Sequence, residues 1–185
     1  MKNLEKTLSS NANAETIVLR LLISLVILAA IFSLVFIGMQ HFETTNAQTT
    51  LEAESNKIIS ASTTLLEHGS ARNLNDPNAK RGSTRSIELF LPSKTRYFSL
   101  GCLPNSNLTD TRYNFEGSLL SYQIQDKSPK NLWLTENINF KKGEIQDFLT
   151  LPQSSQQGVL MTNPGKYTLT LELVEENNTF IILVY

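Results

Sequence analysis

The chain has little of what most enzymes and disulfide-bonded proteins need. Its 185 residues include one cysteine, Cys102, and two histidines, His41 and His68. One cysteine excludes an internal disulfide and a cysteine-rich zinc site. Both histidines precede the region of β-type patterning, which leaves no supportable Ser–His–Asp arrangement, and no phosphate-binding glycine motif occurs. We therefore predict that the protein is not an enzyme and needs no cofactor or metal.

Charge of one sign is also lacking. Sixteen Lys and Arg residues balance 17 Asp and Glu residues, which gives a net charge of −1. Nucleic-acid binding relies on clustered basic side chains that displace counterions, so we expect no nucleic-acid partner. The charges are unevenly spread, however, because none lies between Leu21 and Ile37. This gap in charge is the most informative feature of the sequence.

Residues 17–39 form a long apolar run without proline. A helix needs about 20 such residues to cross the roughly 30 Å hydrocarbon core of a bilayer. The run exceeds the roughly 7–15 apolar residues of a secretory signal peptide, and no small-residue cleavage site follows it. The alternative is a buried core helix, but no other segment could enclose a helix that is apolar on all sides. The run predicts a transmembrane helix at 17–39.

The flanking charges predict the orientation of this helix. Lys2, Lys6 and Arg20 precede or enter the run, whereas the first basic residue after it is Lys57. By the positive-inside rule, the N-terminus is cytoplasmic and the C-terminal region lies outside a single-pass cell membrane protein. Arg20 lies about one turn inside the run, where its side chain can extend toward the lipid headgroups.

The helical pattern continues beyond the apolar run, from 40 to 68. Leu51, Ile58 and Leu65 recur every seven residues, and no proline or glycine occurs between Gly38 and Gly69. This period predicts an amphipathic extension of the same helix, from 11 to 68 in total. The alternative is a separate amphipathic helix packed on its own domain.

Residues 69–85 are rich in Gly, Asn, Asp, Pro and Ser, which predicts a linker. Six basic residues lie between Arg72 and Arg96, and we expect them to be solvated. A contact between these basic residues and an acidic envelope polymer or a neighbouring subunit is a second interpretation.

Residues 86–185 show short apolar runs separated by turn residues, which predicts an external all-β domain. The predicted strands are 86–91, 97–100, 113–115, 119–124, 132–134, 138–140, 148–151, 159–161, 166–174 and 180–185. In the ninth strand, apolar residues alternate with Thr168, Thr170 and Glu172, which predicts one buried and one wet face. The last strand, FIILVY, is apolar on both faces and should be covered twice. The fold class is α+β: a long N-terminal membrane-spanning helix followed by an antiparallel β-sandwich-like domain.

Two sequons for N-glycosylation fall in predicted loops on the external side. Their acceptors are Asn107, in Asn-Leu-Thr, and Asn177, in Asn-Asn-Thr. Both are candidate modification sites.

The N-terminal third, residues 1–67, resembles the class III signal peptide and helix of type IV pilin-like proteins, particularly archaeal ones. In that family a short basic leader precedes an uninterrupted apolar helix, and a glutamate stands at the fifth mature position. Here the leader would be MKNLEKTLSS, residues 1–10, and the mature chain would begin NANAETIVLRLL. The resemblance implies cleavage by a prepilin peptidase between Ser10 and Asn11, with Glu15 as the assembly glutamate. Ser10 replaces the usual Gly or Ala before the cut.

The resemblance implies a structural subunit, a major or minor pilin, of an archaeal cell-surface filament or pseudopilus. Its partners would be the membrane, the peptidase and other pilin-like subunits, bundled through their apolar helices. In such a bundle Glu15 would pair with the new α-amino group of a neighbour. The alternative is a non-polymerising membrane-anchored protein with an external β-sandwich binding domain, such as an archaellum-associated stator component.

Overall fold

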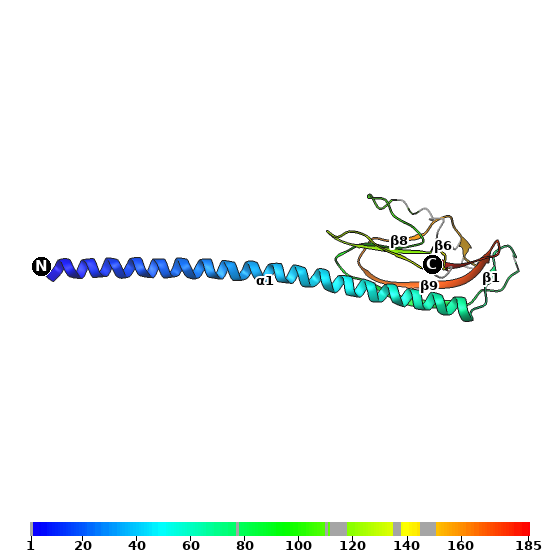
Figure 1. Cartoon of the computed structure of the whole chain (residues 1–185), viewed down its shortest axis with the longest axis horizontal. Coiled ribbons are helices and arrows are strands. Elements are labelled where there is room, and N and C mark those ends of the chain that lie inside the picture. Colours follow the sequence, from blue (N-terminus) through cyan, green and yellow to red (C-terminus); the bar gives the residue numbers. More distant parts are fainter. Residues whose placement is uncertain (1, 77, 110, 112–117, 135–137, 145–150) are drawn as a thin grey trace. The chain divides into compact units, whose positions relative to one another are not determined.

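The structure, a computed structural model, describes residues 2–76, 78–109, 111, 118–134, 138–144 and 151–185 (Figure 1). Side chains are described from residue 19 onward. The chain divides into two parts, Met1–Glu43 and Thr44–Tyr185. The second part contains the last turns of the helix together with all the strands.

The long helix, α1, runs from Lys2 to His68. It begins before Asn11, where the predicted helix starts, because no proline or glycine precedes Gly38 to interrupt it. It ends directly before Gly69, the first glycine after Gly38. The amide of Gly69 donates to the carbonyl of Leu65 at 2.8 Å. A Cβ at Gly69 would lie 2.3 Å from that carbonyl oxygen, so a larger residue does not fit this close turn.

The larger sheet is mixed. Its strands are β1 (Arg72–Asn73), β2 (Thr84–Leu91), β6 (Phe140–Glu144), β7 (Gln153–Ser154), β9 (Gly165–Glu176) and β10 (Thr179–Val184). The order is β1-β9-β10-β6-β7, and β2 pairs with β9 over its whole length. Two pairs, β1 with β9 and β10 with β6, are parallel, so the purely antiparallel domain that the sequence predicts is wrong for this sheet. The antiparallel hairpin of β9 and β10 is confirmed.

The smaller sheet is antiparallel throughout. Its strands are β3 (Thr95–Leu100), β4 (Leu119–Ile124), β5 (Lys130–Trp133) and β8 (Val159–Met161), in the order β5-β4-β3-β8. Gly101 follows β3 with φ of +71°, and a Cβ there would lie 2.1 Å from the carbonyl oxygen of Phe140. Glycine is therefore required where β3 ends against the first residue of β6.

One hydrophobic core joins the two sheets and the end of the helix. The predicted heptad stripe of α1 is buried in it; its members are Ala47, Leu51, Ile58, Ala61 and Leu65, at 0–6% exposure. They pack with apolar residues of both sheets, among them Leu171 of β9 and Phe98 of β3. The α+β class, with a long apolar helix followed by a β-sheet domain, is thereby confirmed.

The last strand is covered on both faces, as its sequence predicts. Ile182 and Val184 belong to the main core, whereas Ile181 and Leu183 form a second cluster with Val174. Leu74 and Tyr185 pack on that second cluster, and no helical residue belongs to it among the described residues.

The remaining parts of the predicted strand pattern are untested or differ from the structure. The strand at 113–115 and residues 148–150 of the strand at 148–151 lie outside the described residues. The strand predicted at 138–140 is shifted, since β6 begins at Phe140. The segment 69–85 contains β1 and the start of β2, which the sequence does not predict.

Candidate functional site

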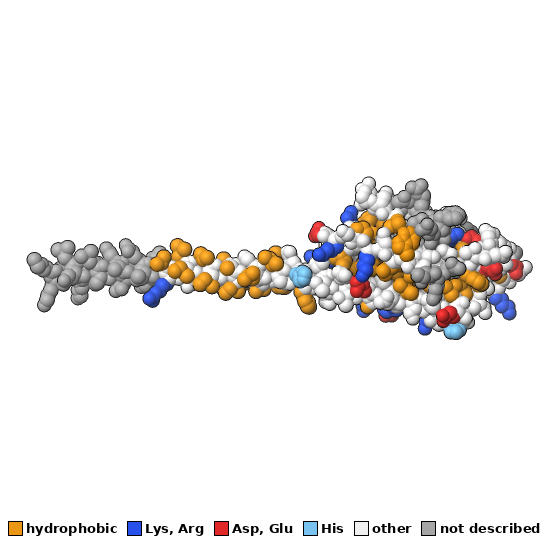
Figure 2. All heavy atoms as spheres, viewed as in Figure 1, with side chains coloured by type: hydrophobic (Ala, Val, Ile, Leu, Met, Phe, Trp, Pro, Cys, Tyr) orange, Lys and Arg blue, Asp and Glu red, His pale blue; other side chains and the backbone are white. Residues whose placement is uncertain are grey.

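The first candidate site is the apolar surface of α1 between Leu19 and Phe42. All its large hydrophobic side chains are exposed, at 49–70%; they are Leu19, Leu21, Leu22, Ile23, Leu25, Val26, Ile27, Leu28, Ile31, Phe32, Leu34, Val35, Phe36, Ile37, Met39 and Phe42. Figure 2 shows hydrophobic side chains covering the visible face of this segment. The helix is long and apolar enough to cross a membrane, and none of its most apolar window is buried within the protein. A surface of this kind requires lipid or a protein partner.

The polar groups of this segment are compatible with an apolar environment. The hydroxyl of Ser24 donates to the carbonyl of Arg20 at 2.9 Å, and that of Ser33 donates to the carbonyl of Ala29 at 2.9 Å. Both hydroxyl protons are thus satisfied inside the helix, as a membrane segment requires. Arg20 is exposed and is the only charged residue from position 19 to position 42.

The residues of the predicted processing site lie within α1. Ser10, Asn11 and Glu15 all have helical backbone, and their side chains lie outside the described ones. The predicted cut between Ser10 and Asn11 and the predicted pairing of Glu15 stay predictions.

Both candidate glycosylation acceptors are exposed. Asn107 lies in the loop after β3, where the hydroxyl of Thr109 accepts a hydrogen bond from the Asn105 side-chain amide at 3.0 Å. Asn177 occupies the first position of the two-residue turn between β9 and β10, with φ of +52°. This turn is tighter than the loop at 175–179 that the sequence predicts.

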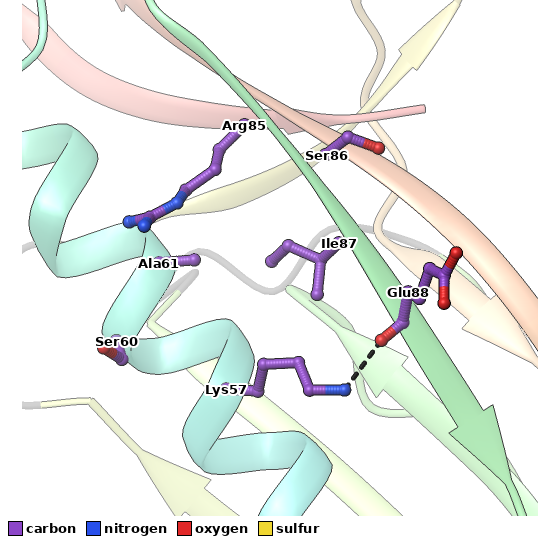
Figure 3. Close-up of a pocket in the computed structure, with 7 residues that line it drawn as sticks. All are labelled: Lys57, Ser60, Ala61, Arg85, Ser86, Ile87 and Glu88. Atoms are coloured by element: carbon purple, nitrogen blue, oxygen red, sulfur yellow. Dashed lines mark hydrogen bonds between the residues drawn. The ribbon is translucent and has the colours of Figure 1, made fainter.

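The second candidate site is a groove of about 400 Å³ between α1 and the edge strand β2. Its lining is Lys57, Ser60, Ala61, Arg85, Ser86, Ile87 and Glu88, which Figure 3 shows as sticks on the helix and on the strand. The ammonium of Lys57 donates to the backbone carbonyl of Glu88 at 2.8 Å (Figure 3). It also donates to the Glu54 carboxylate at 2.6 Å. Lys57 therefore already binds a backbone carbonyl on the free edge of β2. This hydrogen bond disfavours the pairing of a further strand with that edge.

A buried charged network lies where β1, β7 and β9 approach each other. Arg72 is 4% exposed and Glu172 is 0% exposed, and Arg72 Nε donates to Glu172 Oε1 at 2.8 Å. Arg72 Nη2 also donates to the carbonyl of Pro152 at 2.6 Å, and the amide of Gly82 donates to Glu172 Oε1 at 3.1 Å. The prediction that Arg72 is solvated and Glu172 faces water is wrong, because each residue satisfies the other in the interior.

The aromatic ring of Tyr185 extends this network toward solvent. Its hydroxyl donates to Glu172 Oε2 at 3.3 Å and accepts a hydrogen bond from Arg81 Nη2, whose guanidinium lies 5.7 Å from the ring centre. Burial raises the pKa of Tyr185, so its hydroxyl stays protonated and can donate at neutral pH. Sequence reasoning missed these residues; an arginine in a short polar segment and a glutamate on an alternating strand gave no sign that they meet.

The cysteine and the two histidines do not gather with other metal-binding or catalytic residues in the described part of the chain. Cys102 is fully buried, with its thiol 3.7 Å from the carbonyl oxygen of Val159. His41 and His68 are exposed on α1, and His68 is its last residue. The described residues contain no group of three or more His, Cys, Asp or Glu that could hold a metal ion.

Comparison with known proteins gives a family without a described activity. A family model described as "Domain of unknown function (DUF7311)" matches residues 18–185, which include the apolar segment from Val18 and the whole β domain. No curated protein and no solved structure matches the chain. The chain belongs to the DUF7311 family, whose matched region begins at the apolar helix and runs to Tyr185.

Proposed function

We propose that the protein is a pilin-like structural subunit, major or minor, of an archaeal cell-surface filament or pseudopilus. In this proposal the apolar part of α1 first spans the cell membrane with the β domain outside. It later packs against the same segment of neighbouring subunits. The observation that carries the proposal is the fully exposed apolar surface between Leu19 and Phe42.

The size and character of this surface support a role in assembly. An ordinary monomer exposes contiguous apolar patches of at most a few hundred Å². Here large apolar side chains follow one another over about six helical turns with no charge after Arg20. Lipid can cover this surface in the membrane, and a bundle of identical helices can cover it in a filament.

The second half of α1 supports the same proposal in a different way. Its stripe from Ala47 to Leu65 is buried in the core of the β domain. The helix therefore contributes its second half to the core of the domain, and its first half stays free for contacts with lipid or with neighbouring subunits.

Arg20 favours the second candidate function, a membrane-anchored protein that does not polymerise. At a cytoplasmic membrane surface its side chain can reach the headgroups. In a filament core the same charge would be buried and would need a partner, at a cost of several kcal/mol without one. An anchored protein of this kind would present its external β domain as a binding module.

Processing of the N-terminus separates the two functions. The pilin-like function predicts that the native protein loses residues 1–10, whereas the anchor retains them. Intact-mass measurement of the protein purified from its native membrane decides between them. A chain that begins at Asn11 supports the subunit, and a Ser10→Trp variant that blocks the cut provides the control. Retention of residues 1–10 in the native protein would overturn the subunit and favour the anchor.

A further inference from the structure

A small pocket opens where the helix meets β4 and β5. Its volume is about 280 Å³, near the lower end of the roughly 300–1,000 Å³ of small-ligand sites. Its lining comes from α1, β4 and the turn into β5, and consists of Gln48, Tyr122, Ile124, Lys127, Ser128 and Lys130. The neutral polar groups and two ammonium groups around it are all hydrogen-bond donors.

Tyr122 contributes a buried hydroxyl group beside the Lys130 ammonium. The residue is 1% exposed, and its hydroxyl makes no hydrogen bond of normal geometry among the described residues. Its ring stacks on Phe98 at 6.3 Å between centres, which fixes the direction of the hydroxyl. Burial raises the pKa of Tyr122, with the nearby Lys130 acting against this, so the hydroxyl is a proton donor at neutral pH. A buried hydroxyl without a partner costs free energy that a ligand can recover.

The two lysines differ in the ion pairs and hydrogen bonds that their ammonium groups already form. The ammonium of Lys130 lies 6.0 Å from the centre of the Tyr122 ring and donates to the carboxylate of Glu52. Glu52 also accepts from the amide of Gln48 at 3.2 Å, so one carboxylate orders two groups of the wall. An ammonium has three protons, and Glu52 takes one of those on Lys130.

Lys127 forms no ion pair among the described residues. The backbone of the turn positions it: its amide donates to the carbonyl of Ile124 at 3.1 Å, and its carbonyl accepts from the Gln123 side chain at 2.7 Å. Asp126 beside it has φ of +61° and forms no ion pair with Lys127. Counting Glu52 and Asp126 against the two lysines leaves no net charge, so hydrogen-bond donors, rather than an excess of positive charge, favour an anion here.

We propose that this pocket binds a phosphate group, with Lys127, Lys130 and the Tyr122 hydroxyl donating to its oxygens. An oxyanion suits a wall that offers donors from three separate elements and no free acceptor of comparable strength. The side chain of Ile124 and the Tyr122 ring offer apolar surface to the alcohol part of a phosphate ester. The phosphate can come from a soluble ester or from a lipid headgroup, since Gln48 follows Met39, the end of the apolar run, by nine residues.

The test uses the full chain labelled with fluorotyrosine and reconstituted in phosphatidylcholine nanodiscs. The Tyr122 fluorine resonance is assigned by its absence in Tyr122→Phe. In one arm glycerol phosphate is titrated, and a saturable shift of that resonance identifies binding of a soluble ester. In the other arm the discs contain phosphatidylglycerol and no soluble phosphate, and the same shift identifies the headgroup.

Two variants make the test specific. Lys127→Gln should weaken the affinity about 10- to 100-fold, which is the usual effect of one charged hydrogen bond. Lys142→Gln removes a lysine of equal charge from β6 in the other sheet and should leave the affinity unchanged. In a parallel measurement, Tyr122→Phe should unfold at the temperature of the wild type but lose the stabilisation that glycerol phosphate gives. The absence of a saturable shift in both arms, or an equal loss in the two lysine variants, would overturn the proposal.

Discussion

The apolar segment of α1 and the β domain depart from the usual arrangement of side chains in opposite directions. Between Leu19 and Phe42 the large apolar side chains are exposed. Among the described residues from Thr44 onward, by contrast, three charged side chains are buried, namely Arg72, Lys141 and Glu172. The exposed apolar side chains require a covering medium, and the buried charged side chains require partners of opposite charge.

The buried charges are satisfied by the domain itself. Arg72 pairs with Glu172 at 2.8 Å, and Lys141 pairs with the half-buried Glu176 at 2.7 Å. The exposed apolar side chains have no comparable partners within the described residues. The β domain and the second half of α1 thus bury their apolar and charged groups against each other, whereas the apolar segment exposes side chains that lipid or other helices can cover.

The largest effect is expected from breaking the buried ion pair. Arg72→Met removes the cation and leaves Glu172 charged in the interior, where the amide of Gly82 and the Tyr185 hydroxyl are its remaining partners. Loss of one member of a buried pair costs about 3–5 kcal/mol. Denaturant unfolding of the full chain in detergent, followed by near-ultraviolet circular dichroism, measures the change.

A double variant provides the control for this prediction. Arg72→Met combined with Glu172→Leu removes both charges, and apolar residues of similar size often replace a buried pair without loss. We expect the double variant to regain most of the stability that the single variant loses. A single variant within about 1 kcal/mol of the wild type would show that the β domain does not depend on this network.

The next effect compares two isoleucines of the same helix. Ile58 is 0% exposed in the core, and Ile27 is 55% exposed in the apolar segment. Ile58→Ala should destabilise the β domain by about 2–5 kcal/mol because it leaves a cavity. Ile27→Ala should change the unfolding free energy by less than about 0.5 kcal/mol. The same unfolding experiment measures both, and equal effects would contradict the division of α1 into a free half and a packed half.

The helix could be predicted from the sequence because its signals are local. The seven-residue recurrence of Leu51, Ile58 and Leu65 needs only the geometry of a helix to place them on one face, and all three are buried. The β9–β10 hairpin was equally accessible, since its strands are neighbours in the chain and its turn is short. The exposure of the apolar segment could also be predicted, because the segment is apolar on all sides and no other part of the chain could cover it.

The rest depends on contacts between residues that are distant in the sequence. The parallel pairing of β6 with β10 joins residues 42 positions apart, such as Phe140 and Ile182, and no local pattern specifies it. Arg72 and Glu172 are 100 positions apart, so each alone has the sequence pattern of a solvated residue. The proposed phosphate pocket likewise combines Gln48 with the β4–β5 turn, and only the packing of α1 on the smaller sheet brings them together.

The smallest effect concerns an ion pair at the surface. Glu52 and Lys130 are 40% and 45% exposed at the side chain, in contrast with the buried pair. The hydrogen bond from Lys130 lowers the pKa of Glu52 below its ordinary value of 4.5.

A carboxyl group whose pKa falls on folding stabilises the protein above its unfolded-state pKa, and this contribution is lost as the pH falls through the folded-state value. Solvent and salt screen a pair this exposed, so Glu52→Gln should cost at most about 1 kcal/mol at pH 7 and less at pH 3. Unfolding free energies at the two pH values, with Asp126→Asn as the unpaired control, provide the measurement. An undiminished cost at pH 3 would mean that Glu52 acts through packing of its side chain, and that the surface of the β domain, like its interior, depends on more than charge.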